Sequence, residues 1–361
     1  MAAAAVAAAT SGFDELAGVA RLSHRWNLMK VLVTGATGFI GHHVARRLVA
    51  GGHGVRALVR DGGKAERVLG PLGLRTDDFI VGEMTDAVAV ARAFDGCDAV
   101  LHAAAMVSVT SGTRDFRGNR LGTETVVGGA VERGLETIFV SSMLAIFDPR
   151  RPMNDASPIG RSRTHYGRSK AECDRWVRAR QAEGAPVGIV YPSGCVGPDD
   201  PGMSESVKAY RSFLRGTLRS EGGNQMVDVR DLAELIVRLL EDRTRGRVVA
   251  GGHFLDWDEF TRMLEEATGA RIPRISAPGW LLRAVARSMD GIGRLSGRRM
   301  PMTGEGVEIA TRVRPMEDSK CVRELGIVWR DPVETLRDLF QWFLDSGKLP
   351  PRAVPALRAR C

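Results

Sequence analysis

The chain has 361 residues, a net charge of +8 and apolar side chains at 44% of its positions, as is ordinary for a soluble globular protein. Its Lys and Arg residues are scattered over both halves, and it has neither zinc-finger spacing nor an RNP-like aromatic motif, so we expect no nucleic-acid partner. No apolar run is long enough for a transmembrane segment, and the five widely spaced cysteines contain no C-x-x-C pair. We therefore expect reduced thiols and a cytoplasmic location.

Residues 1–28 are predicted to be a disordered or dispensable extension. Ala2 to Ala9 is apolar, but no basic segment precedes it, and Asp14 and Glu15 follow it too closely for a usual signal peptide. Met29 directly precedes the first predicted strand. We therefore expect the folded part of the chain to begin there.

A predicted buried strand over residues 31–33 runs into a glycine-punctuated turn, and an amphipathic helix follows. One glycine permits the tight turn, one lets backbone N–H groups approach a pyrophosphate, and one lets the helix pack on the strand. Glycine-rich turns also occur for structural reasons alone, but the position between a strand and a helix favours dinucleotide binding. The residues expected to hold the dinucleotide here are Gly35, Thr37, Gly38, Phe39, Ile40 and Gly41.

Strands and helices then alternate, which predicts an α/β fold with a doubly wound parallel sheet and helices on both faces. The further predicted strands are 54–59, 79–81, 99–102, 137–142, 187–190 and 247–249. The further predicted helices are 119–130, 166–183, 207–218, 231–241, 258–268, 280–295 and 331–344. Ligand sites in such sheets lie beyond the carboxyl ends of the strands.

Seven motifs in order make the chain resemble an extended short-chain dehydrogenase/reductase of the NAD(P)-dependent epimerase/dehydratase superfamily. They are Thr34-Gly35-x-x-Gly38-x-x-Gly41, His102-Ala103-Ala104-Ala105, Asn119-x-x-Gly122-Thr123, Val140-Ser141-Ser142, Tyr166-x-x-x-Lys170, Pro192-Ser193-Gly194 with Gly197-Pro198, and Val227-Asp228-Val229-Arg230-Asp231. The resemblance runs from about residue 29 to 346 and is greatest to the dihydroflavonol reductase-like and 3β-hydroxysteroid dehydrogenase-like branches.

The resemblance implies a Rossmann NAD(P)-binding domain over 29–194 and a smaller C-terminal lobe, mainly substrate-binding, over 195–346. Residues 226–250 would return to the Rossmann sheet, and residues 347–361 are expected to be a loose tail. The other residues placed at the cofactor are Glu83, Met84, Ala103, Ala104, Ala105, Tyr166, Lys170, Pro192, Ser193 and Gly194.

Tyr166 and Lys170 are four residues apart on a predicted helix and therefore share a face. An ammonium beside a phenol favours the phenolate and lowers the pKa of the phenol, so Tyr166 is predicted to exchange a proton with a carbonyl or an alcohol. Ser142, at the end of the fifth strand, is predicted to bond the oxygen whose charge changes. The resemblance implies that Lys170 also bonds the nicotinamide ribose, and that Ser142 rather than Ser141 is catalytic. A surface pair is the alternative for Tyr166 and Lys170.

Four further polar residues have a predicted role near this site. Asn119 is predicted to order a proton-relay water or brace the site, with a helix N-cap as the alternative. His102 is interpreted as a structural residue at a strand end, and His165 as an exposed neighbour of Tyr166. Asp228 is interpreted as a helix-entry cap. No metal site is predicted.

The end of the second predicted strand bears on the choice between NAD and NADP. An NAD enzyme usually carries an acid there for the ribose 2′-OH, but this chain has Arg60, with Lys64 close behind. A guanidinium suits a 2′-phosphate, so we predict NADP as the cofactor, with NAD possible. The alternative is that Arg60 is solvated and Asp61 serves the ribose.

Together these features predict an NADP-dependent oxidoreductase that transfers a hydride between nicotinamide and a fairly apolar small-molecule carbonyl or alcohol, such as a ketone, aldehyde or sterol-like compound. The helix over 280–295 is interpreted as a lid over that substrate, or as a membrane-surface helix. One alternative is a nucleotide-sugar epimerase or dehydratase, although residues 143–148 lack the hydroxyl and Tyr-Gly pair usual in sugar enzymes. Another alternative is a non-catalytic NADP-sensing protein. The expected partners are a small-molecule substrate and, as a possible homodimer, a second copy of the chain.

Overall fold

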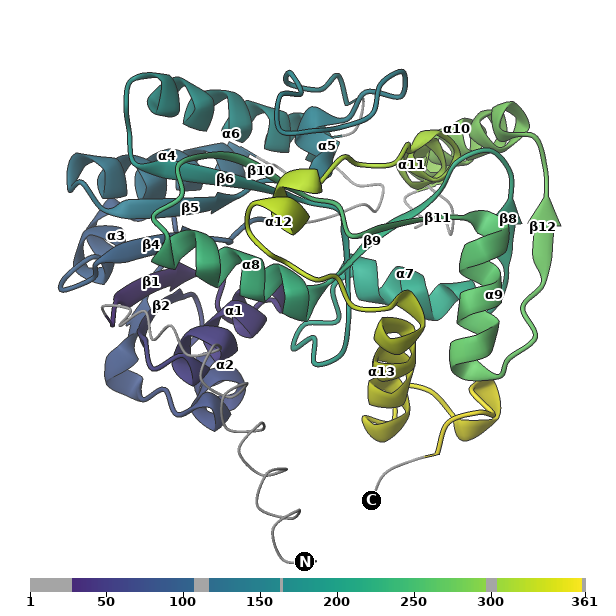
Figure 1. Ribbon diagram of the computed structural model, residues 1–361, viewed down its shortest axis with the longest axis horizontal. Coiled ribbons are helices and arrows are strands. Elements are labelled where there is room, and N and C mark those ends of the chain that lie inside the picture. The colour runs from purple at the N-terminus through teal and green to yellow at the C-terminus, as the bar shows by residue number, and fades with distance from the viewer. Residues whose placement is uncertain (1–27, 107–116, 163–164, 297–303, 359–361) are drawn as a thin grey trace, which may run out of the picture.

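The computed structural model describes residues 28–106, 117–162, 165–296 and 304–358 of the chain, without the side chains of residues 290, 292–296 and 305 (Figure 1). Residues 1–27 of the predicted extension and residues 359–361 of the predicted tail lie outside the described residues.

A seven-stranded sheet with parallel pairing forms the larger part of the fold (Figure 1). Its strands, from one edge to the other, are β10 (Gly246–Ala250), β6 (Val187–Pro192), β5 (Glu136–Val140), β4 (Ala99–His102), β1 (Lys30–Thr34), β2 (Gly54–Val59) and β3 (Phe79–Val81). The strand order reverses direction between β1 and β4, and ligands of such sheets bind in the crevice beyond the carboxyl ends at this point. The predicted Rossmann architecture is confirmed.

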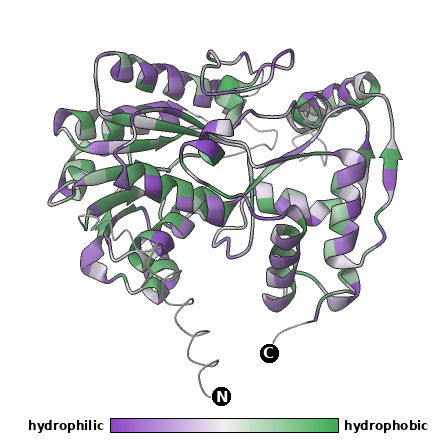
Figure 2. Ribbon diagram, in the orientation of Figure 1, coloured by the Kyte–Doolittle hydropathy of each residue, from purple (hydrophilic) through white to green (hydrophobic). Residues whose placement is uncertain are grey.

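Helices cover both faces of this sheet. Helices α1 and α8 pack together on one face, and α3, α4 and α6 lie on the other (Figure 1). The helices of this part are α1 (Phe39–Ala50), α2 (Gly62–Leu69), α3 (Ala87–Ala93), α4 (Arg117–Glu132), α5 (Met143–Ile146), α6 (His165–Ala182) and α8 (Val229–Glu241). Figure 2 shows the strands of the main sheet largely in green, as expected for parallel strands that are buried on both faces.

The remaining elements form a smaller lobe beyond the carboxyl ends of the strands. Its helices are α7 (Glu205–Phe213), α9 (Trp257–Thr268), α10 (Gly279–Ser296), α11 (Gly304–Arg312) and α13 (Pro332–Asp345), while α12 (Ser319–Arg323) contacts β10 of the main sheet. A small sheet has the order β11 (His253–Asp256), β9 (Gly223–Asp228) and β7 (Gly194–Val196), and β8 (Thr217–Arg219) pairs with β12 (Arg274–Ser276). Edge-to-face and tilted contacts among Tyr210, Phe213, Trp257 and Phe260 pack α7 against α9.

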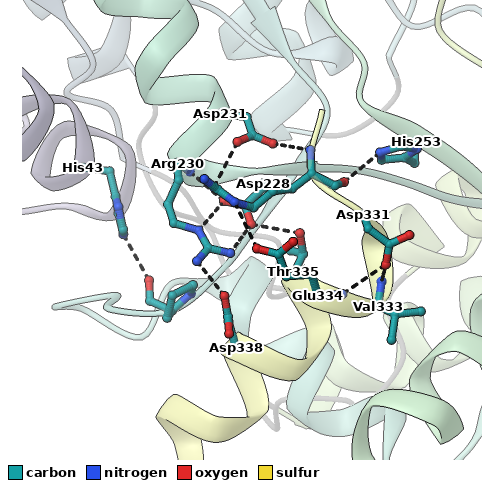
Figure 3. A network of polar contacts seen from close by, with 12 residues as sticks. His43, Asp228, Arg230, Asp231, His253, Asp331, Val333, Glu334, Thr335 and Asp338 are labelled. Atoms are coloured by element: carbon teal, nitrogen blue, oxygen red, sulfur yellow. Dashed lines mark hydrogen bonds and ion pairs between the residues drawn. The ribbon is translucent and has the colours of Figure 1, made fainter. Parts of the chain in front are cut away.

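A charged network joins α13 of the lobe to the start of α8 (Figure 3). The Arg230 guanidinium lies 2.7 Å from a carboxylate oxygen of Asp228 and 2.6 Å from one of Asp338. The Thr335 hydroxyl donates to the Asp228 carboxylate at 2.9 Å. The backbone N–H of Arg230 also donates to this carboxylate, at 2.7 Å. Because Asp228 is buried, its charge requires such partners. Its predicted role as the cap of α8 is confirmed.

Several predicted boundaries differ from those of the structure. The helix predicted over 207–218 ends at Phe213, because Gly216 takes a φ of +153° and the chain then enters β8. The fifth strand ends at Val140 rather than at residue 142, since the next residues begin a short helix. Within the segment 226–250, α8 packs on the main sheet and β10 joins its edge as predicted, but β9 pairs with β7 and β11 instead.

The C-terminal segment packs onto the lobe up to residue 358, so the expectation of a loose tail is wrong for this part. Val354 is fully buried and Leu357 nearly so. The Ala356 N–H donates to the Thr268 carbonyl at 3.0 Å, and the Gln341 amide donates to the Arg358 carbonyl at 2.7 Å. Burial of two apolar side chains holds this proline-rich segment in place.

Candidate active site

The glycine turn between β1 and α1 has the shape of a phosphate cradle. Gly35 takes a φ of +78°, and a Cβ there would lie 2.8 Å from the Ala104 nitrogen. A Cβ on Gly41 would collide with the Gly35 carbonyl. Gly38 stands at the N-cap of α1 and brings no side chain to the N–H groups of the first turn. Those groups can therefore serve an anion, and the turn fits a dinucleotide pyrophosphate.

The chain after β4, at Ala103 and Ala104, runs beside this turn. The Ala104 N–H donates to the Thr34 hydroxyl at 3.3 Å. His102, the last residue of β4, contacts two hydroxyl groups. Its Nδ1 lies 2.8 Å from the Thr34 hydroxyl oxygen, and its Nε2 lies 3.2 Å from that of Thr123. Burial, with a smaller contribution from the Lys170 charge, lowers the pKa of His102 to about 3. Its ring is therefore neutral near pH 7, and its contacts are those of a structural residue.

Arg60 follows β2 directly, and its side chain is exposed with no hydrogen-bond or ion-pair partner among the described residues. The neighbouring Asp61 caps α2, because its carboxylate accepts from the Lys64 N–H at 2.9 Å. Glu83 and Met84 follow β3, the strand next to β2. At this corner of the sheet the Arg60 guanidinium thus has no partner among the described residues, whereas one oxygen of the Asp61 carboxylate is engaged by the cap of α2.

Lys170 is buried on α6, and its Nζ donates to the Val140 carbonyl at 3.1 Å. The ammonium also lies 5.5 Å from the centroid of the Phe139 ring. Burial lowers the pKa of Lys170, while Cys173 and Asp174 oppose this effect. Tyr166, half-buried, stands one helical turn earlier on α6. The structure therefore places the predicted pair beside the carboxyl end of β5.

The two serines after β5 have different surroundings. Ser142 is half-buried at the N-cap of α5, and its hydroxyl oxygen accepts from the Leu144 N–H at 3.2 Å. Because this contact uses only the oxygen, the Ser142 O–H can still donate to a ligand. The Ser141 hydroxyl instead donates to the buried carboxylate of Asp174 at 3.3 Å.

Asn119 braces two segments near the site and is not the N-cap of a helix. It lies inside α4, where its Oδ1 accepts from the Met106 N–H at 2.7 Å. Its Nδ2 donates to the Met106 carbonyl and to the Ser169 hydroxyl, both at 3.1 Å. Asn119 thus links the chain after β4 to α6, the helix of Tyr166 and Lys170.

Pro192, Ser193 and Gly194 lie where the chain passes from the carboxyl end of β6 into β7. The Ser193 hydroxyl donates to the Gly251 carbonyl at 2.8 Å, so its side chain holds the end of β10. A Cβ on Gly194 would lie 2.8 Å from the Gln225 carbonyl oxygen. The Ser193 N–H also donates to the Ala250 carbonyl at 3.0 Å, so Ser193 is held to the end of β10 by both its backbone and its hydroxyl.

A buried charge cluster behind the site escaped the sequence analysis. The fully buried Asp174 accepts from the Tyr191 hydroxyl at 2.8 Å, and one of its oxygens lies 2.9 Å from Arg178 Nε. Burial raises the pKa of Asp174, and Arg178, Tyr191 and Ser141 counteract this effect. The spacing of Lys170, Asp174 and Arg178 by four residues was the available signal, because it places all three on one face of α6.

Known proteins resemble the chain over most of its length. A putative dihydroflavonol 4-reductase of Synechocystis is 28% identical, covering 87% of this chain and 94% of its own. Sterol demethylase protein B of Methylococcus capsulatus is 29% identical, covering 89% of this chain and all of its own. A UDP-glucose 4-epimerase of Thermus thermophilus, solved with NAD, has the same fold at a TM-score of 0.67 and 22% identity, covering 87% of this chain and 99% of its own.

No helix in the described part of the chain is long and apolar enough to span a membrane. The model of the NAD dependent epimerase/dehydratase family matches residues 31–251, a span that holds the glycine turn, Ser142, Tyr166 and Lys170. The chain therefore belongs to this family, the extended short-chain dehydrogenases/reductases, and is an NAD(P)-dependent enzyme.

Proposed function

We propose that the protein is an NADP-dependent oxidoreductase that transfers a hydride between nicotinamide and a fairly apolar carbonyl or alcohol. The observation that carries this proposal is the bond from the buried Lys170 ammonium to the Val140 carbonyl. It brings the helix of Tyr166 against the strand that ends just before Ser142. A phenol, an ammonium and a hydroxyl are the groups needed to move a proton to and from a reacting oxygen.

Each side chain has one role in this proposal. The bound cofactor supplies or accepts the hydride. In the reductive direction the Tyr166 hydroxyl gives its proton to the substrate oxygen, and in the oxidative direction it takes a proton from the alcohol. Ser142 donates a hydrogen bond to the same oxygen and stabilises its developing charge. Lys170 is the cation that favours the phenolate of Tyr166, and it binds the nicotinamide ribose.

The choice of NADP rests on the corner of the sheet after β2. A 2′-phosphate there meets an exposed, uncommitted Arg60, whose planar fork suits bidentate contact with phosphate. The rival cofactor is NAD, with Asp61 as the ligand of the ribose hydroxyls. The bond from the Lys64 N–H to one oxygen of the Asp61 carboxylate favours Arg60 over this rival, because it reduces the capacity of Asp61 to accept from the ribose, whereas Arg60 has no partner among the described residues.

A ketone, an aldehyde or a sterol-like compound is the proposed class of substrate. The segment after Ser142, Met143–Ile146, is apolar and buried, and it offers no hydroxyl group to a sugar. The names of two relatives, a putative dihydroflavonol 4-reductase and sterol demethylase protein B, support an apolar substrate. Nucleotide-sugar epimerisation is the second candidate, supported by the likeness of the fold to a UDP-glucose 4-epimerase.

A screen of NADPH consumption tests this proposal with aldehydes, ketones, keto-steroids and NDP-sugars, on the wild type and on Tyr166→Phe. We expect net oxidation of NADPH with an apolar carbonyl. The variant should lose turnover by roughly 10²–10⁴-fold, because its proton donor is missing, while its affinity for NADPH stays nearly the same. Sugar epimerisation without net NADPH consumption, or wild-type kcat in the variant, would overturn the proposal.

A further inference from the structure

A basic cavity of about 790 Å³ lies in the C-terminal lobe, where the end of α7, the turn after α9 and the segment after α13 meet. None of the described residues that line it is acidic. Its cationic lining residues are Lys208, Arg211, Arg215, Arg271, Lys348 and Arg352. Ser212, Leu214, Gly269, Ala270, Leu349, Ala353 and Pro355 complete the lining.

Most of this positive charge is not balanced within the described part of the protein. Lys208 pairs with Glu205 at 3.1 Å, and Lys348 lies 4.2 Å from the centre of the Trp342 ring. The four lining guanidiniums have no carboxylate within ion-pair distance among the described residues. Six cations around one cavity repel one another, and a bound anion would reduce that repulsion.

Stabilisation of helix ends is the alternative explanation for these cations. Helices α7, α9 and α13 all end near the cavity, and cations beside a helix C-terminus are favourable. Each helix end carries only about half a negative charge, so three ends balance fewer than two of the five cations that remain besides the Lys208–Glu205 pair. The excess therefore points to an external anion.

The cavity is separate from the candidate active site. None of its lining residues belongs to the glycine turn or to the group formed by Ser142, Tyr166 and Lys170. Figure 1 shows α9 and α13 at the lower right of the molecule, whereas α5 and α6 lie at the top. The packed aromatic cluster of α7 and α9 forms the core of the lobe beside the cavity. An anion held here would thus bind in addition to the dinucleotide.

We propose that this cavity binds a small molecule with two or more linked phosphate groups. Its volume is in the range that holds a small ligand. Several guanidiniums spread around one cavity match the spread charge of linked phosphates better than a single phosphate, and each guanidinium can bind phosphate oxygens in pairs. The apolar residues Leu214, Ala270 and Leu349 give an attached organic group a surface to contact.

Calorimetric titration with sodium tripolyphosphate and with orthophosphate tests the proposal, at about 0.15 M ionic strength to screen weak surface attraction. Each titration is run with and without saturating NADPH. We expect one tripolyphosphate site per chain, at least tenfold tighter than orthophosphate and unchanged by NADPH. Competition with NADPH would place the binding at the cofactor site, and equal affinity for both anions would show unspecific attraction; either result overturns the proposal.

Two triple variants with the same change in net charge locate the site. Arg211→Gln/Arg215→Gln/Arg271→Gln should weaken tripolyphosphate binding roughly 1,000-fold, because each of the three lost guanidiniums costs about tenfold. The control variant, Arg92→Gln/Arg262→Gln/Arg323→Gln, removes three exposed guanidiniums outside the cavity. Its affinity for tripolyphosphate should differ less than twofold from that of the wild type. Equal weakening in both variants would contradict the proposal. Melting temperatures close to that of the wild type show that both variants are folded.

Discussion

The Lys170 ammonium donates a hydrogen bond to the Val140 carbonyl at 3.1 Å and ties α6 to the end of β5. One turn further along α6, the Asp174 carboxylate accepts from the Ser141 hydroxyl at 3.3 Å. These two contacts hold the helix against the same short stretch of chain. Ser142, which follows directly, is thereby held in position relative to Tyr166, because each belongs to one of the two elements joined.

The two neighbouring serines should respond differently to removal of the hydroxyl. Ser142→Ala should lower kcat by roughly 10²–10³-fold, because a donor to the reacting oxygen is lost. Ser141→Ala should leave kcat within a few-fold but lower the free energy of unfolding by about 1.5–3 kcal/mol, since its partner is the buried Asp174 carboxylate. Steady-state kinetics and urea unfolding of both variants check this. The assignment fails if Ser141→Ala shows the larger loss of kcat.

Arg60 should decide the preference between the two cofactors. A charge-assisted contact with the 2′-phosphate is worth about 1.5–3 kcal/mol, so NADPH should bind roughly 10–100-fold more tightly than NADH. Arg60→Ala should abolish most of this preference, because it should lower the affinity for NADPH and leave the affinity for NADH unchanged. Arg92→Ala, an exposed arginine on α3, is the control and should leave it unchanged. Equal affinities of the wild type for NADPH and NADH would contradict this assignment and favour the alternative, in which Asp61 binds the ribose of NAD.

Gly35→Ala should impair both folding and cofactor binding. Its φ of +78° disfavours a side chain, and the new Cβ would press on the Ala104 nitrogen at 2.8 Å. Gly73→Ala is the matched control, because Gly73 has a φ of +90° but no atom within 4 Å of an added Cβ. We expect about 1–2 kcal/mol of destabilisation from backbone strain in the control and a larger loss in Gly35→Ala. Only Gly35→Ala should weaken NADPH binding more than tenfold in a fluorescence titration.

His102 should make the fold sensitive to mild acid. Burial holds its pKa at about 3, whereas the unfolded chain protonates its histidines near pH 6.5. The unfolded state therefore binds more protons as the pH falls, so the stability present above pH 6.5 is progressively lost below it. Between pH 6.5 and 5 this loss is about 2 kcal/mol for one histidine.

Urea unfolding at several pH values measures that slope. His102→Gln should be less stable near pH 7, because its contacts with Thr34 and Thr123 change, but its stability should fall less steeply with acid. The same substitution at the exposed His165 serves as the control and should keep the wild-type slope. An unchanged slope in His102→Gln would show that this residue is not the source of the acid sensitivity.

The order of the elements could be predicted from the sequence because parallel strands buried on both faces appear as short apolar runs. The bounds of β2, β3 and β4 agree with those predicted. The site residues could be placed because all of them lie at the carboxyl ends of strands or in the helices that follow. Local patterns of this kind involve neighbours in sequence, which the sequence shows directly.

Features formed by distant segments could not be predicted in the same way. Arg230 and Asp338 pair across 108 positions, and nothing in either local pattern indicates the other. The basic cavity combines residues near 210, 270 and 350, which only the packing of three helix ends brings together. The C-terminal segment was predicted to be a loose tail because of its prolines. The burial of Val354 and Leu357 could not be predicted, because it depends on the packing of the segment against the lobe.

The most direct test of the proposed function follows the hydride itself. The enzyme is incubated with NADPH carrying deuterium at both C4 positions and with the best carbonyl substrate from the screen, and the product is examined by mass spectrometry. The account predicts an alcohol with one deuterium on the former carbonyl carbon, formed in equal amount with NADP⁺. Products without deuterium, or epimerised NDP-sugar formed without net NADP⁺, would contradict it.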